Sequence, residues 1–163
     1  MTTDFSRFTP RAAEALREAA DHIEANPDNY DWHIPEQCNC GILAQKLTGL
    51  DTADLNEALS NGVRCNDEYI GHYGLWRSFN AEQAAVCQTT GLTVTHIAKH
   101  LIAEGFTNDD LDDIESLGNS DVLSVTGTFT DARYGMPKAV PENVVRYFRA
   151  MADLITEAHA VPA

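Results

Sequence analysis

The chain has 163 residues, the usual size of a single domain built around one hydrophobic core. Hydrophobic residues make up 44% and charged residues 22%, a balance that excludes an intrinsically disordered chain. The 25 Asp and Glu residues outnumber the 11 Lys and Arg residues, and a formal net charge of -14 argues against binding to nucleic acid or to an anionic membrane surface. We expect one domain over residues 1–163, with flexible ends at 1–8 and 160–163.

The N-terminal sequence has no apolar segment after a basic start, so it does not look like a secretory signal. No stretch of the chain approaches the roughly 20 apolar residues of a membrane span. We therefore expect a cytoplasmic protein that does not associate with membranes. Its four cysteines are expected to be reduced in that compartment; they are Cys38, Cys40, Cys65 and Cys87.

The first third of the chain predicts three helices separated by loops. Thr9 and Pro10 are typical of a helix start, and the helix that follows should end before Pro27. A second helix is expected over residues 39–48, with Gly49 as a left-handed stop, and a short third helix over residues 53–61. Two loops rich in aromatic residues, at 26–37 and 62–79, flank the second and third helices.

Helical patterns return at residues 81–90, 93–104 and 108–117, each ended by a glycine. Residues 121–137 are rich in β-branched residues and turn formers, so they favour one small β-hairpin. Pro141 then opens a long helix with one apolar stripe, formed by Val144, Phe148, Met151, Ile155 and Ala158. Seven helical segments and at most one hairpin predict a mainly α protein, in which the long first and last helices form the scaffold.

Two cysteines, one residue apart, stand at the start of the second helix. Cys40 shares the apolar stripe of that helix with Leu43 and Leu47, so it should behave as a small core residue. Cys38 lies off this stripe, at the N-cap or just before it, where backbone N–H groups and the helix dipole would favour the thiolate. Cys38 is therefore the candidate nucleophile if the protein is a thiol enzyme.

A cysteine-dependent hydrolase or transferase also needs a base, which the fold would have to bring to Cys38. His33 and His72 lie in the two aromatic loops and are the preferred candidates. In this hypothesis the amides at the start of the second helix would stabilise an oxyanion. No complete catalytic set is visible in the spacing of the residues, so a non-enzymatic binding or regulatory protein is the leading hypothesis.

The binding hypothesis places a pocket around Cys38, walled by the two aromatic loops. If those loops meet over the start of the second helix, they could hold a small molecule or a peptide. The candidate ligand-binding residues are Trp32, Tyr69, Tyr73, Trp76 and Cys40. The pattern indicates no cofactor and leaves the oligomeric state open.

A metal-binding protein is the third hypothesis. His96 and His100 are four residues apart, so one face of a helix would carry both and they could share an ion, with a cysteine or a carboxylate completing the site. The acidic run at 108–121 lacks the alternating Asp pattern and the Gly of an EF-hand loop. We expect it to form a solvated acidic helix, and we assign no metal site.

The stretch "AAEALREAADHIEANPDNYD", followed by "CNCGILAQKLTG", resembles the opening of certain small uncharacterised bacterial and phage proteins. In that group, a helix with Ala-Leu-Arg and Ile-Glu precedes a Pro, a Tyr-Asp pair, a cysteine-containing turn and a short helix. The resemblance covers about the first third of the chain. It implies no function, since none is known for the group.

Overall fold

The computed structural model describes residues 2–31, 37–51, 53, 100–126 and 140–160. These residues form five α-helices: α1 (Pro10–Ala25), α2 (Asn39–Thr48), α6 (Asn108–Ser116), α7 (Ser120–Thr126) and α8 (Pro141–Ala158). Two short 3-10 turns, η1 (Phe5–Arg7) and η2 (Pro27–Asn29), flank α1. The described ranges contain no β-strand, which confirms a mainly α protein. The predicted helix at 81–90 lies outside the described residues, as do all but residue 53 of the helix at 53–61 and residues 93–99 of the helix at 93–104.

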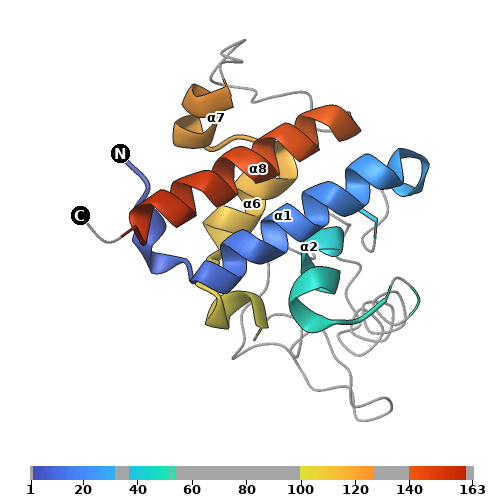
Figure 1. The fold of residues 1–163 in the computed structure, drawn as a ribbon, viewed down its shortest axis with the longest axis horizontal. Coiled ribbons are helices and arrows are strands. Elements are labelled where there is room, and N and C mark those ends of the chain that lie inside the picture. The colour runs from blue at the N-terminus through green and yellow to red at the C-terminus, as the bar shows by residue number, and fades with distance from the viewer. Residues whose placement is uncertain (1, 32–36, 52, 54–99, 127–139, 161–163) are drawn as a thin grey trace, which may run out of the picture.

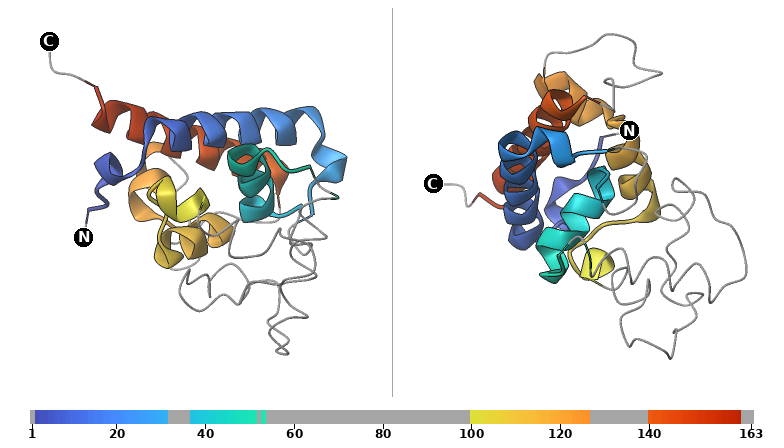
Figure 2. Two further views of the ribbon diagram at one scale, coloured as in Figure 1. Left: turned by 90° about the horizontal axis from the view of Figure 1, so that it is seen from below. Right: turned by 90° about the vertical axis from the view of Figure 1, so that its right-hand side faces the viewer.

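The two longest helices, α1 and α8, run antiparallel along one side of the molecule, as Figure 1 shows. In Figure 2 they form one layer, with α2 and α6 on its inner side, while α7 lies along α8. The buried face of α1 is built largely from small side chains, which allow α8 to approach closely; they are Ala12, Ala13, Ala15, Ala19 and Ala20. The predicted scaffold of first and last helices is therefore confirmed.

The N-terminal segment packs into the core instead of forming the flexible end that we expected for residues 1–8. Phe5 and Phe8 are buried, and the Phe8 ring meets the edge of Phe106 with the centroids 5.0 Å apart. Gly105 makes this approach possible. Its φ is +98°, and a Cβ there would lie 2.4 Å from the carbonyl oxygen of Arg7.

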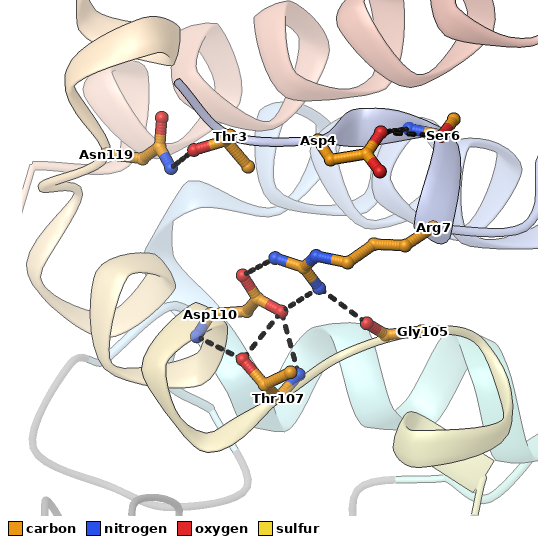
Figure 3. A network of polar contacts seen from close by, with 8 residues as sticks. All are labelled: Thr3, Asp4, Ser6, Arg7, Gly105, Thr107, Asp110 and Asn119. Carbon is orange, nitrogen blue, oxygen red and sulfur yellow. Dashed lines mark hydrogen bonds and ion pairs between the residues drawn. The ribbon is translucent and has the colours of Figure 1, made fainter. Parts of the chain in front are cut away.

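Helix α6 begins with a network that fastens it to the N-terminal segment (Figure 3). Thr107 and Asp110 cap each other's backbone N–H groups, as in a capping box. The Arg7 guanidinium donates hydrogen bonds to both carboxylate oxygens of Asp110 at 2.5 Å and also to the carbonyl of Gly105. The prediction of a solvated acidic helix is wrong at Asp110 and at Glu115, whose side chains are buried.

Residues 121–126 belong to helix α7, so the predicted hairpin is wrong over this stretch, and its remainder at 127–137 lies outside the described residues. The Asn119 side chain accepts hydrogen bonds from the backbone N–H groups of Asp121 and Val122, which is the geometry of an N-cap. Burial of Val122 and Leu123 overrides the β-branched composition. Along α8, Val144, Phe148, Met151 and Ile155 are buried as predicted, whereas Ala158 is exposed beyond the end of the core.

Candidate functional site

The start of α2 has the local structure that the sequence predicts. Cys38 is the N-cap residue, and its Sγ accepts a hydrogen bond from the Gly41 N–H at 3.4 Å. Helix α2 ends at Thr48, and Gly49 follows with a φ of +77°, the left-handed stop that favours glycine. Cys38 is fully buried, however, although it lies off the apolar stripe of α2.

A carboxylate from α6 reaches across to the start of α2. Glu115 Oε1 accepts hydrogen bonds from the Cys40 N–H at 2.6 Å and from the Cys38 thiol at 3.2 Å. Glu115 is only 1% exposed, and a carboxylate facing the positive end of a helix is favourably placed. The first turn of α2 is therefore capped twice, by Cys38 from its own chain segment and by Glu115 from another helix.

Two further polar side chains complete this junction. Asn39 is fully buried, and its Nδ2 donates to the carbonyl of Ile114 at 2.9 Å. The Tyr30 hydroxyl donates to Asn39 Oδ1 at 2.5 Å. Burial, followed by the charge of Glu115, raises the pKa of the Tyr30 phenol, so this hydroxyl keeps its proton and serves as a donor.

Cys40 is a core residue, as its place on the apolar stripe predicts. It is fully buried, and its Sγ lies 3.5 Å from the carbonyl oxygen of Leu111. Burial, reinforced by Glu115, raises the pKa of the Cys40 thiol well above its ordinary value. A buried thiol that holds its proton is a poor nucleophile, so Cys40 contributes packing to this region.

The start of α2 therefore lacks two features that a thiol enzyme would need there. The Cys38 thiol has no exposed surface, and it donates its hydrogen to Glu115. The amides of Cys40 and Gly41, which would stabilise an oxyanion, already bind Glu115 and Cys38. These contacts join α2 to α6. They also occupy the Cys40 and Gly41 amides, so neither amide is directed at a ligand.

Most of the other predicted site residues lie outside the described residues. These are Trp32, His33, Tyr69, His72, Tyr73, Trp76 and His96, and their proposed roles stay predictions. His100 is half-buried, in the short helical stretch that Gly105 terminates. Within the described ranges, no group of three or more His, Cys, Asp or Glu side chains is arranged to hold a metal ion.

A second region, which the sequence did not single out, contains a hollow of about 430 Å³ between the end of α1 and the start of α8. These two helix ends lie beside each other on the right of Figure 1. The hollow combines apolar and charged side chains, and it is lined by Ile23, Glu24, Pro27, Pro141, Glu142, Val145, Arg146 and Arg149. The opposite charges on the outer faces of the two predicted scaffold helices are a sequence signal that could have located it.

One wall of the hollow is a fixed group of ion pairs. Arg149 binds both oxygens of Glu24, at 2.9 and 3.2 Å, and also Asp21 at 3.0 Å. The two carboxylates raise the pKa of the Arg149 guanidinium, and Arg149 lowers the pKa of Glu24. Arg149 and Glu24 are therefore charged at neutral pH, and the ion pairs of this group join α1 to α8 at this end.

No protein-family model matches this chain, and no curated protein or solved structure is similar enough to match it. The resemblance of the first third to small bacterial and phage proteins stays a prediction. Among the described residues, no helix combines the length and the apolar character that crossing a membrane requires.

Proposed function

We propose that this chain is a non-enzymatic binding or regulatory protein whose ligand is a small molecule. The observation that carries the proposal is the hollow of about 430 Å³ between α1 and α8. Its volume lies in the lower part of the range of small-molecule sites, and its combination of apolar surface with a few charged groups is typical of them. The ligand would be small, since a larger one would extend beyond the hollow.

The packing at the start of α2 supports a binding protein over a thiol enzyme. Cys38, Cys40 and Glu115 bind one another and backbone groups, and the two thiols have no exposed surface. We assign this junction a structural role: it holds α2 against α6. A pocket around Cys38, walled by the two aromatic loops, stays a prediction because its aromatic residues lie outside the described ranges.

The proposal can be tested by chemical-shift mapping of the full-length, isotope-labelled protein with a library of small acids, amines, zwitterions and neutral compounds. We expect at least one class to shift the amide resonances of Ile23, Val145 and Arg146, which line the hollow. If no compound shifts them, or if binding maps elsewhere, the proposed site is wrong.

Two tryptophan variants provide a matched control. Pro27 is exposed and borders the hollow, so Pro27→Trp should fill part of it and abolish binding. Glu157 is exposed at the other end of α8, so Glu157→Trp should leave binding unchanged. Equal effects of the two substitutions would contradict binding in the hollow. Turnover that requires Cys38 would instead favour the thiol enzyme.

A further inference from the structure

The charged groups around the hollow divide into those that are already paired and those that are not. Both oxygens of Glu24 are bound to Arg149, and Arg149 is further held by Asp21. These ion pairs neutralise part of the charge on this wall, although the two carboxylates keep further lone pairs that can accept a hydrogen bond. The wall therefore contributes shape to the hollow and less selectivity for a charged ligand than groups without an ion pair.

Two opposite charges on α8, Glu142 and Arg146, line the same hollow and are exposed. They are four residues apart and thus on one face of the helix. No ion pair joins them to each other or to another side chain in the described part of the chain. Within the described residues, the Arg146 guanidinium makes one hydrogen bond, to the carbonyl of Thr126 at 2.9 Å, and a guanidinium has further N–H donors.

Between these charges and the fixed wall, the hollow offers apolar surface. The rings of Pro27 and Pro141 supply this surface, because Ile23 is fully buried and Val145 is only 6% exposed. An apolar group placed here would leave water without requiring a hydrogen bond in return. Among the residues that the structure describes, the site thus offers one acidic and one basic group that no ion pair engages, together with apolar surface.

The charge of the whole chain restricts the ligand further. A formal net charge of -14 opposes the approach of an anion, whereas it has little effect on a molecule without net charge. A simple cation would find Glu142 but would also face Arg146. A zwitterion satisfies both groups at once.

Resting on the proposed function, we infer that the ligand is a small zwitterion with an apolar body, of the kind represented by an apolar amino acid. Its ammonium group would bind Glu142, its carboxylate would bind Arg146, and its side chain would lie against Pro27, Pro141 and the exposed edge of Val145. The site recognises both charges of the ligand, so a ligand with only one of them should bind more weakly.

A matched set of ligands tests this inference on the full-length protein. The set is L-leucine, 3-methylbutylamine, 4-methylpentanoate and glycine: the zwitterion, the same molecule without its carboxylate, the same molecule without its ammonium group, and the zwitterion without an apolar body. We expect leucine to bind in the hollow roughly fivefold more tightly than the amine or the acid, the factor for one partly exposed ion pair. Glycine should bind more weakly still, since it lacks the apolar contact.

Two variants assign each charge to its residue. Glu142→Gln should weaken leucine roughly fivefold and leave 4-methylpentanoate unchanged, because that acid has no ammonium group to lose. Arg146→Gln should weaken leucine and the acid but not 3-methylbutylamine. Glu157→Gln, an exposed change of the same kind at the far end of α8, should alter none of these affinities.

The outcomes separate this inference from the proposed function. If leucine binds the hollow no more tightly than its amine and its acid, the zwitterion is wrong, although a binding protein remains supported by the ligands that do bind. If both Gln variants bind leucine as the unaltered chain does, the assigned contacts are wrong. If neither these compounds nor the wider library shifts the hollow, the proposed function fails as well.

Discussion

The starts of α2 and α8 differ in what their first turns contact. At the start of α2, Cys38 caps its own helix, and Glu115 from α6 binds the Cys40 amide inside the core. At the start of α8, Val140 provides no side-chain cap, and the first turn borders a hollow. The conspicuous Cys-x-Cys motif thus marks the closed helix start, while the open one has no recognisable motif. A helix start is a candidate ligand site only where other groups of the protein do not already pack against its first turn and bind its N–H groups.

The largest effect on stability should come from Glu115→Ala, which removes the carboxylate that caps the start of α2. The change leaves the Cys40 amide and the Cys38 thiol buried without this acceptor, at a cost of about 4 kcal/mol in the free energy of unfolding. Urea denaturation measures it. If Glu115→Ala changes stability as little as a substitution at the exposed Glu142, the two helix starts do not differ as described.

Substitutions in the turn before α6 test how that helix is held in the position that brings Glu115 to the start of α2. Gly105→Ala would push a Cβ against the Arg7 backbone and strain a positive φ, so we expect a loss of about 3 kcal/mol. Gly49→Ala is the matched control. It shares the positive φ but has open space around the new Cβ, so it should cost about 1 kcal/mol. Similar losses for both in thermal or urea unfolding would rule out the close approach.

Cys38 itself can be replaced by a better capping residue. Cys38→Ala removes the cap and should cost about 1.5 kcal/mol, whereas Cys38→Ser keeps an acceptor for Gly41 and a donor for Glu115 and should cost less than about 0.5 kcal/mol. Paired thermal melts of the two variants provide the measurement. Equal losses for Ala and Ser would show that capping is not the role of this side chain.

The acidic helix that carries Glu115 should also make stability depend on pH. Burial, with repulsion from Asp110 and Asp112, raises the pKa of Asp113 from 3.8 to about 6. Between pH 3.8 and about pH 6, the folded state therefore keeps a proton that the unfolded chain releases. The free energy of unfolding falls as the pH rises through this range.

Asp113→Asn removes this dependence. It should stabilise the protein by about 1 kcal/mol at pH 7, a value reduced to allow for solvent screening of a half-exposed group. It should also flatten the profile of unfolding free energy between pH 4 and pH 6. An unchanged slope in that range, measured by urea unfolding at several pH values, would place the titration elsewhere.

The smallest effect should come from the open helix start. Glu142→Gln removes an exposed first-turn charge that has no ion pair within the described residues, so we expect a change of at most about 0.5 kcal/mol. Its effect should appear in ligand binding. A stability loss as large as that of Glu115→Ala would show that Glu142 has a structural role.

Local sequence signals predicted the helices whose ends are set by nearby residues. Thr9 caps α1, Gly49 ends α2 and Pro141 opens α8, all as expected. The prediction was wrong at α7, where burial against α8 and a cap from Asn119 outweighed the preference of Val122 for strands.

The candidate sites were harder to predict because both depend on contacts between distant parts of the chain. Glu115 lies 75 residues from Cys40, and its place in an acidic run gave no sign that it would be buried. The same carboxylate accepts a hydrogen bond from the Cys38 thiol, which is fully buried. The hollow requires α1 and α8 to run antiparallel with their ends in register, which neither helix shows alone.

The most direct test of the closed helix start is alkylation of the native protein by iodoacetamide, with mass spectrometry resolving Cys38 from the other cysteines. We predict that Cys38 is unreactive until urea unfolds the protein, and that Glu115→Gln, which weakens the cap but keeps an acceptor, increases its reactivity. Rapid alkylation of Cys38 in the fully folded, unaltered chain would contradict the account and return Cys38 to the role of a nucleophile.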